Sequence, residues 1–294
     1  MNIRRLKDRL ASKLMLSATL LSSLLVFIII FSLFQKSLPI LTTQPIDKLL
    51  FSSSWNPLEG QFGFYPFIVG TVWVTILAMA LSIPASLLTS IYLAEYASSR
   101  IHGIIKPMID LLAGIPSVIF GLLGVLIVVP FVRNDLAPIV GASTTGYSLL
   151  SGSIVLAIMV FPIIISVSTE VIKAVPQAHR KASMALGATK WQTIKHVVVP
   201  SSLSGLAAAI VLGFGRAFGE TMAVLMVIGN VARVPSSPFD PAYPLPALIA
   251  NNYGEMMSIP AYDSSLMFAA LILLVIVILF SVIAEIALKR AKKV

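Results

Sequence analysis

The chain has 294 residues, of which 57% are hydrophobic and 11% are charged, and its formal net charge is +9. Soluble domains are about 45–50% apolar and about 25% charged, so the composition excludes an ordinary soluble protein and predicts an integral membrane protein. The chain has no cysteine and only three histidines, which excludes disulfide and thiolate chemistry and argues against a metal site.

Long intervals without a charged residue predict an all-α, polytopic transmembrane bundle. Each interval reaches the roughly 20 residues that a helix needs to cross about 30 Å of hydrocarbon, and none alternates like the strands of a membrane barrel. The first interval follows a basic segment and lacks a cleavage site, so we expect a retained anchor rather than a signal peptide. The six predicted spans are 14–35, 67–95, 108–131, 151–172, 202–229 and 265–288.

Lysine and arginine residues are distributed unevenly between the predicted loops. Most of the 21 lysine and arginine residues lie in four segments: five in 1–13, two in 98–106, five in 173–200 and four in 289–294. Because cytoplasmic loops retain these residues, both termini are expected in the cytoplasm. The chain is expected to be a multi-pass protein of the bacterial inner membrane. The cations occupy four short segments without interleaved aromatic residues, which argues against nucleic-acid binding.

Two longer loops are expected on the outer side. Residues 36–66 and 230–263 are rich in turn formers, and the second carries six prolines, so both predict irregular connections. Composition leaves two interpretations open. The loops either dock a soluble partner or merely connect helices.

The cytoplasmic segment 173–200 is too long and too patterned for a simple turn. Pro176 can begin a short helix, where its missing N–H costs nothing. Gly187 lies where a left-handed cap would end that helix. A second short helix is expected from about Lys190 to His196. Two short helices outside the membrane would form a protrusion that another protein can bind.

The same segment resembles the cytoplasmic "EAA" loop of ABC importer permeases, whose spacing is E-A-A-x3-G-x9-I-x-L-P. Lys181 stands where that family commonly has Glu, whereas the glycine and the terminal proline match. The resemblance implies that this loop docks into a cleft on an ATPase subunit. The residues assigned to this coupling loop are Lys181, Ala182, Ser183, Ala185, Leu186, Gly187, Ala188, Trp191 and Pro200.

Further motifs resemble the phosphate-specific importer permeases, and the PstC type more closely than the PstA type. They are WNP at 55–57, IYLAEYAS at 91–98, AGIPSVIFG at 113–121 and GRAFGETMAV at 215–224. The resemblance implies a type I ABC importer permease fold. It also implies a homologous PstA-type permease, two ATPase subunits and an extracellular phosphate-binding protein as partners. The expected parts are 1–66 (basic N-terminus, first helix and external loop), a permease core at 67–288, and a basic tail at 289–294.

Arg216 and Glu220 are two charges inside an apolar run. A charge at the bilayer centre costs at least about 2.5–3.5 kcal/mol, but residues four apart on a helix can pair. The G-x3-G pattern of Gly215 and Gly219 favours close approach of another helix and an interior position. One hypothesis is a structural ion pair. The other, favoured by the resemblance, is a substrate pathway formed by Arg216, Glu220 and Thr221, in which the guanidinium binds phosphate.

The chain contains no G-x4-G-K-[ST] motif, so we expect it to bind no nucleotide and no cofactor, with ATP bound and hydrolysed by a partner subunit. We therefore expect a transport subunit rather than an enzyme, since no Ser-His or paired-carboxylate constellation stands out. Two alternatives stay open. One is an ABC importer for sulfate or molybdate, and the other is a secondary anion transporter, for which we find no convincing internal repeat.

Overall fold

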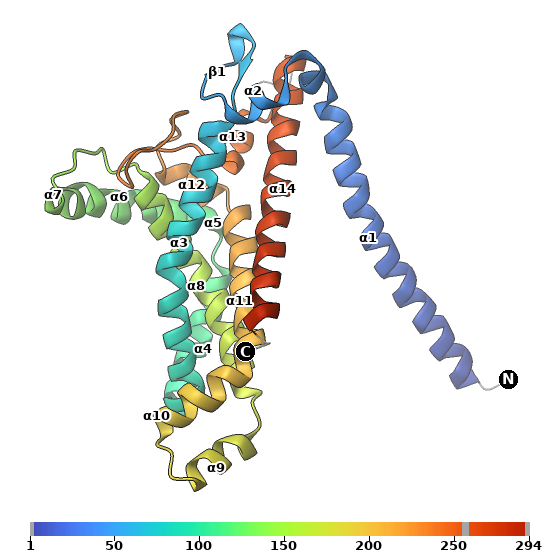
Figure 1. Ribbon diagram of the computed structural model, residues 1–294, viewed down its shortest axis with the longest axis vertical. Coiled ribbons are helices and arrows are strands. Elements are labelled where there is room, and N and C mark those ends of the chain that lie inside the picture. Colours follow the sequence, from blue (N-terminus) through green and yellow to red (C-terminus); the bar gives the residue numbers. More distant parts are fainter. Residues whose placement is uncertain (1–2, 255–258, 292–294) are drawn as a thin grey trace.

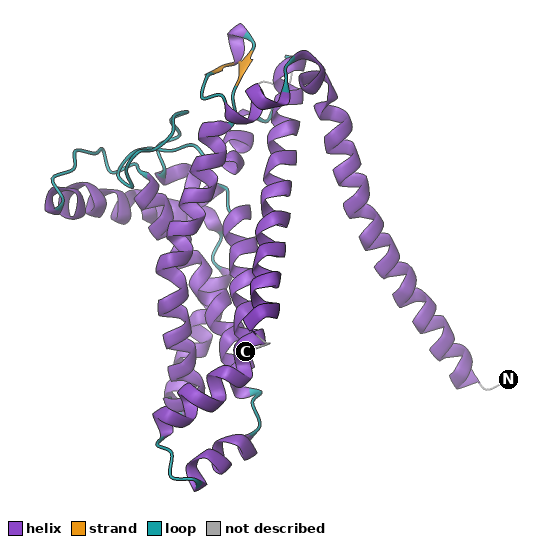
Figure 2. Ribbon diagram, in the orientation of Figure 1, coloured by secondary structure: helices purple, strands orange, loops and turns teal. Residues whose placement is uncertain are grey.

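The computed structural model describes residues 3–254 and 259–291, and most of them lie in helices (Figure 2). Six helices in this part of the chain are long and apolar enough to cross a membrane. They are Leu10–Thr43, Tyr65–Tyr96, Ser117–Ile139, Leu149–Lys173, Lys190–Gly219 and Pro260–Ile286. This confirms the all-α bundle with six spans, although three of the six differ from the predicted helices.

Four long helices form the centre of the bundle (Figure 1): α3 (Tyr65–Ile91), α8 (Leu149–Lys173), α11 (Val199–Gly219) and α14 (Pro260–Ala291). Small hydroxyl residues on α3, such as Ser82 and Ser86, are fully buried, and small side chains let membrane helices approach closely. Large apolar side chains fill the remaining space between α3, α8 and α11, among them Met79, Leu156 and Ile164. The predicted spans 67–95, 151–172 and 265–288 match these helices closely.

The first helix, α1 (Ile3–Thr43), extends beyond the predicted span 14–35 at both ends. It contacts α14 and then diverges from the bundle (Figure 1). Its large apolar side chains are exposed within the chain, as Phe27 and Phe31 illustrate. A bilayer or another protein is therefore needed to cover this helix.

The predicted span 108–131 is wrong as a single helix. Helix α4 (Ser99–Gly114) lies along α8 and ends before Pro116, because a residue that precedes proline is pushed out of the α conformation. Ile115 accordingly has an extended backbone. A second helix then projects sideways from the bundle (Figure 1). It consists of α5 (Ser117–Leu123), η3 (Gly124–Val128), α6 (Val129–Phe131), η4 (Val132–Leu136) and α7 (Ala137–Ile139).

Three π-helical turns inside the long helices end two residues before a proline. These are η3 before Pro130, η4 before Pro138, and η5 (Ile194–Val198) before Pro200. A proline inside an α-helix loses one hydrogen bond and its ring collides with the carbonyl four residues earlier. A local π turn lets neighbouring groups satisfy the freed backbone. These prolines therefore do not end their helices.

One end of the bundle carries a short helix and a hairpin. These are α2 (Ile46–Phe51), β1 (Trp55–Asn56), the 3-10 turn η1 (Pro57–Glu59) and β2 (Gln61–Phe62), with β1 antiparallel to β2. Trp55 contacts Phe62, Phe67 and Tyr262 edge-on, which fixes the hairpin to α3 and α14. The second predicted loop contains α13 (Leu245–Asn252). Both loops are thus more ordered than predicted, and residues 255–258 lie outside the described residues.

The opposite end of the bundle carries two helices that project beyond α3 and α8 (Figure 1). They are α9 (Gln177–Ala185) and α10 (Lys190–Thr193), the latter continuing through η5 into α11. Within the bundle, α3 continues into the π turn η2 (Tyr92–Tyr96), and α11 is followed by the short α12 (Met222–Val227).

Candidate functional site

The projecting segment between α8 and α11 begins as predicted. Pro176 has an extended backbone and caps α9, which starts at the next residue. Gly187 lies just beyond the end of α9 with φ +88°, a left-handed conformation that glycine adopts without strain. The predicted glycine cap at Gly187 is therefore confirmed.

The second short helix of the projection differs from the prediction. It begins at Lys190, where Thr189 and Gln192 form a reciprocal capping box, but it does not end near His196. It continues through η5 into α11, so that residues 190–219 form one helix. The π turn before Pro200 explains the continuity, because it accommodates a residue that normally interrupts a helix.

The projection exposes apolar side chains. Leu186 is 91% exposed, and Trp191, at the start of the long helix 190–219, is 54% exposed. Among the other predicted coupling residues, Lys181, Ala182, Ala185, Gly187 and Pro200 are exposed, and Ser183 and Ala188 are half-buried. The Ser183 and Thr193 hydroxyls lie 3.0 Å apart and link α9 to the start of the long helix. This surface fits a partner protein.

Arg180 is a residue of this segment that the sequence did not single out. It lies on α9, yet it is only 6% exposed. Its Nη2 lies 2.6 Å from Oε1 of Glu95 at the end of η2, and its guanidinium also donates to the carbonyls of Ile172 and Val175. Glu95 was the sequence signal that could have revealed this contact. It is a carboxylate at the edge of a predicted span, and a buried carboxylate requires a partner.

The predicted fifth span, 202–229, is not one helix. It ends at Gly219, Glu220 has an extended backbone (φ −74°, ψ 127°), and α12 starts at Met222. The carboxylate of Glu220 is buried and accepts hydrogen bonds from the backbone N–H groups of Thr221 (3.1 Å) and Ala223 (3.4 Å). Glu220 therefore caps the start of α12, an interaction that the sequence spacing did not indicate.

Arg216 and Glu220 do approach each other, but loosely. Nη2 of Arg216 lies 3.8 Å from Oε2 of Glu220, and the Arg216 side chain is 48% exposed. A pair of this geometry contributes little stability. Thr221 is half-buried, and its hydroxyl donates to the carbonyl of Gly219 at 3.3 Å. The three predicted pathway residues thus lie together at the break between α11 and α12.

The glycines beside Arg216 do not pack against another helix among the residues that the structure describes. A Cβ atom added at Gly215 or Gly219 would meet nothing within 4 Å, whereas one added at Gly213 would lie 2.9 Å from Ile164. The predicted close approach of a helix to the G-x3-G pattern is therefore wrong within the chain. The face of α11 that carries Gly215, Arg216 and Gly219 is open.

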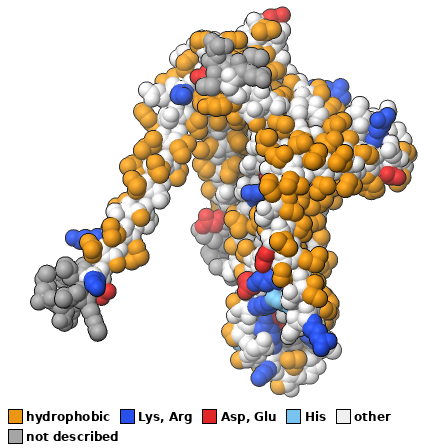
Figure 3. Space-filling model, turned by 180° about the vertical axis from the view of Figure 1, so that it is seen from behind, with side chains coloured by type: hydrophobic (Ala, Val, Ile, Leu, Met, Phe, Trp, Pro, Cys, Tyr) orange, Lys and Arg blue, Asp and Glu red, His pale blue; other side chains and the backbone are white. Residues whose placement is uncertain are grey.

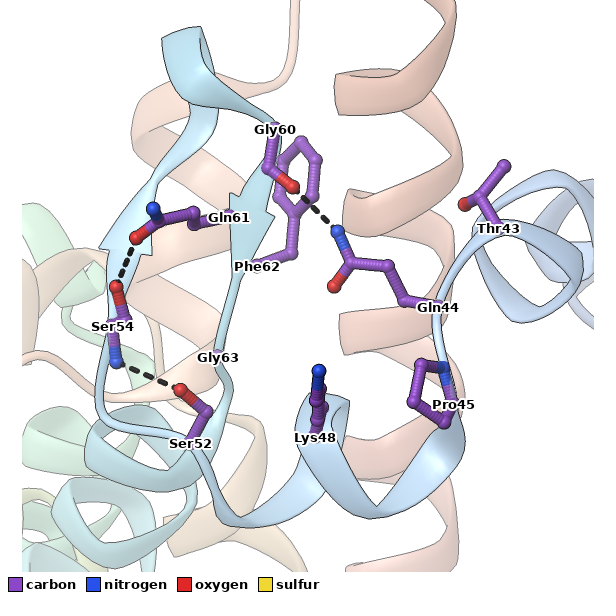
Figure 4. Close-up of a pocket in the computed structure, with 10 residues that line it drawn as sticks. All are labelled: Thr43, Gln44, Pro45, Lys48, Ser52, Ser54, Gly60, Gln61, Phe62 and Gly63. Atoms are coloured by element: carbon purple, nitrogen blue, oxygen red, sulfur yellow. Dashed lines mark hydrogen bonds between the residues drawn. The ribbon is translucent and has the colours of Figure 1, made fainter.

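A polar hollow of roughly 370 Å³ lies at the hairpin end (Figure 4). The ammonium group of Lys48 points into it, and the Gln44 amide donates to the Gly60 carbonyl across its rim. The Ser54 hydroxyl donates to the side chain of Gln61. Hydroxyl and amide groups around one cation can accept an anionic group from a partner or solute.

Basic side chains gather around the end that carries α9 and α10 (Figure 3). Among them are Lys106, which forms a 2.9 Å ion pair with Glu170, and Lys190, whose ammonium lies 4.5 Å from the ring centre of Tyr96. Within the described residues, no three His, Cys, Asp or Glu side chains are grouped to hold a metal ion. The charges at this end fit a protein contact or a membrane boundary.

Comparison with known proteins identifies the family. Residues 86–293 match the binding-protein-dependent transport system inner membrane component family. The chain is 40% identical to the probable ABC transporter permease protein YqgH of Bacillus subtilis over 84% of this chain and 79% of that protein. It is 35% identical to the phosphate transport system permease protein PstC of Mesorhizobium japonicum, over 88% of this chain and 83% of that protein.

Solved structures show the same fold. A chain of a bacterial ABC transporter that imports the acidic polysaccharide alginate covers 97% of this chain and 99% of its own length, with a TM-score of 0.62 and 17% identity. A chain of the MetNI methionine ABC transporter has a TM-score of 0.58 and 17% identity, over 81% of this chain and 99% of its own. The fold is that of type I ABC importer permeases. This multi-pass inner-membrane chain belongs to the family of binding-protein-dependent transport system inner membrane components.

Proposed function

We propose that the chain is the PstC-type permease subunit of an ATP-driven phosphate importer and forms half of its translocation pathway. The observation that carries the proposal is the similarity to permeases named for phosphate transport, which are 31% and 35% identical over 94% and 88% of the chain. The exposed apolar residues of the projection support a coupled rather than an independent transporter.

The surfaces that the chain leaves open support the proposed partners. The projection around Leu186 and Trp191 docks into an ATPase subunit, which binds and hydrolyses ATP, so this chain needs no cofactor of its own. A homologous PstA-type permease covers the open face at Gly215, and the complex holds two ATPase subunits. An extracellular phosphate-binding protein docks at the hairpin end. Both termini of this chain then lie in the cytoplasm, as the lysine and arginine asymmetry favours.

Arg216 is the phosphate-contacting residue of the pathway. Its half-exposed guanidinium can offer two parallel donors to an oxyanion, while the buried carboxylate of Glu220 holds the start of α12 and moderates the positive charge. Thr221 lies at the same break. A conduit must bind its ion well enough to admit it and weakly enough to release it. A single arginine near one carboxylate meets this requirement better than a cluster of unpaired cations.

The test is reconstitution of the complete importer in liposomes. Phosphate uptake should require the ATPase subunits and the binding protein, and excess sulfate or molybdate should not compete. Competition by either anion at equal concentration would favour the alternative of another oxyanion importer. Uptake that follows an ion gradient without ATP would favour a secondary transporter and contradict the proposal.

A further inference from the structure

The helix α9 at the tip of the projection contacts the ends of α3 and α8 through one buried side chain. Arg180 is the residue of α9 that is buried, whereas its neighbours Lys181, Ala182 and Ala185 are exposed. The rest of α9 packs on α10 and η5, which form the start of the long helix 190–219 and lead to α11 rather than to α3 or α8. A force on α9 therefore reaches α3 and α8 through Arg180.

The contacts of Arg180 connect three separate segments. Its Nε and Nη2 donate to Oε1 of Glu95 at 3.0 and 2.6 Å, which ties α9 to the end of α3 through η2. Nη2 also donates to the Ile172 carbonyl at 2.8 Å, and Nη1 donates to the Val175 carbonyl. These carbonyls belong to the last turn of α8 and the residues after it, where helix carbonyls lack internal partners.

The burial of this pair distinguishes it from a surface ion pair. The Arg180 and Glu95 side chains are each 8% exposed. The Lys106–Glu170 pair, also at this end of the bundle, is 47% and 60% exposed. A buried ion pair is weak evidence for stability, because apolar residues of similar volume often stabilise as well. What a charged, directional contact adds is a fixed geometry between the three segments.

We propose that Arg180 is a positioning residue that transmits movement between the ATPase-docking projection and the spanning helices α3 and α8, with Glu95 as its counterpart. The inference rests on the proposed function, since it assumes that an ATPase moves α9. In this mechanism α9, the end of α3 and the end of α8 move together. Loss of the contact leaves α9 able to bind the ATPase but unable to pass its movement on.

The experiment compares Arg180→Gln and Glu95→Gln with Lys106→Gln, a matched control that breaks the exposed pair. Each variant is assembled with its partners, and ATPase co-purification, ATP hydrolysis and phosphate uptake are measured. For Arg180→Gln and Glu95→Gln we expect normal co-purification, ATP hydrolysis that no longer responds to binding protein and phosphate, and about tenfold less uptake. Lys106→Gln should behave like the unsubstituted complex.

Two results would overturn the inference. One is unchanged coupling in both buried-pair variants. The other is loss of the ATPase subunit in proportion to the loss of uptake, which would make Arg180 only a structural anchor. The unsubstituted complex is first tested with phosphate, sulfate and molybdate. If sulfate or molybdate stimulates ATP hydrolysis and phosphate does not, the proposed substrate is refuted. The Arg180 and Glu95 variants are then tested with the anion that stimulates. No stimulation by any of the three refutes both proposals.

A covalent replacement of the contact gives a second, independent test. The chain has no cysteine, so Ala94→Cys and Gln177→Cys introduce the only thiols of this subunit. Both positions line a hollow of roughly 340 Å³ beside Arg180 and Glu95. In the Arg180→Gln background, a thiol-reactive cross-linker between them should restore the response of ATP hydrolysis to phosphate several-fold. Unrestored coupling in molecules whose bridging is verified by mass spectrometry would contradict the inference.

Discussion

Arg180–Glu95 and Arg216–Glu220 are both arginine–glutamate pairs, but they differ in sequence separation, in distance and in the exposure of the arginine. Arg180 and Glu95 are 85 residues apart in sequence, 2.6 Å apart in space and each 8% exposed. Arg216 and Glu220 are four residues apart, yet their charged groups lie 3.8 Å apart and the arginine is 48% exposed. The pair that spacing makes obvious is the looser one. Nearness in sequence indicates that two charges can meet, whereas a short distance and burial of both side chains indicate that they do meet in the fold.

The two residues of the loose pair, Arg216 and Glu220, make different contacts. Glu220 directs its carboxylate to the backbone of α12, through Thr221 and Ala223, and Arg216 faces the open side of α11. The arginine is therefore free to bind an anion without first breaking a strong ion pair. The tight pair offers no such freedom, because both of its partners are occupied and buried. This difference supports the proposed substrate contact of Arg216 and the proposed positioning role of Arg180.

The largest expected effect comes from Arg216→Gln. Uptake should be abolished, while the free energy of unfolding changes by less than about 1 kcal/mol, because the removed pair is half-exposed and long. Transport in proteoliposomes and thermal melting of the purified complex measure the two quantities. Arg216→Lys is the control, since it keeps the charge without the planar fork. Normal uptake by the Gln variant would show that Arg216 does not contact the substrate.

The next largest effect is a loss of stability when the charges of Arg216 and Glu220 are exchanged. Arg216→Glu combined with Glu220→Arg places an arginine at a site where the native side chain is 6% exposed and leaves two N–H groups of α12 without their acceptor. We expect a loss of about 3–5 kcal/mol in the free energy of unfolding. A melting temperature equal to that of the unsubstituted protein would refute the capping role of Glu220.

Because the reversal should destabilise α12, loss of uptake by the reversed variant would not distinguish a structural ion pair from a substrate pathway. The informative contrast is instead between Arg216→Gln and Arg180→Gln. The first should lose transport and keep the response of ATP hydrolysis to the docked binding protein, and the second should lose that response. Identical behaviour of the two variants would remove the distinction between the pairs.

A smaller effect distinguishes the two faces of α11. Gly213→Ala places a Cβ 2.9 Å from Ile164, which should cost about 1–3 kcal/mol through overpacking. The Cβ of Gly215→Ala meets no atom of the described part of the chain within 4 Å, so this change should leave the isolated chain as stable or slightly more stable. Chemical denaturation of the two variants measures the difference. Equal destabilisation by both would mean that the face beside Arg216 is not open.

The smallest effect concerns a third arginine–carboxylate pair, Arg233 and Asp240, whose charged atoms lie 3.7 Å apart. The Ser236 hydroxyl, then the N–H groups of Ser236 and Ser237 and the charge of Arg233, lower the pKa of Asp240. Its contribution to stability is therefore present above the pKa of the unfolded aspartate and lost as the pH falls through the lower folded pKa.

Hydrogen exchange of residues 231–244 should accordingly keep its protection between about pH 5 and 8 and lose some only below about pH 4, after correction for the intrinsic rate. Asp240→Asn is the control and should remove this pH dependence. Loss of protection near pH 6 would contradict the assignment to Asp240.

The sequence predicted the existence of the membrane helices far better than the positions at which those helices break. The spans 67–95, 151–172 and 265–288 were predictable because membrane helices need long uncharged runs, and Gly187 because a left-handed cap favours glycine. The failures have physical causes. Pro116 breaks the third span whereas Pro200 is absorbed by a π turn, and hydropathy does not distinguish the two.

The missed site residue has a different cause. Arg180 looked like one of several cations in a basic loop, and its burial arises only when α3 and α8 bring their ends together with α9. Glu220 was recognised as important, but its role in capping α12 depends on a break in the helix that no charge or apolar pattern revealed. Tertiary contacts decided both cases.

The π turn before Pro200 makes the fifth span one continuous helix with a bend near its start. Residues 190–219 form one unbroken helix of 30 residues, about 45 Å along its path, and α10 lies at an angle to α11 (Figure 1). Trp191 occupies the short arm, and Arg216 lies near the far end of the long arm. A sideways displacement of Trp191 therefore reaches Arg216 within a single helix, without passing through a loop that could absorb it.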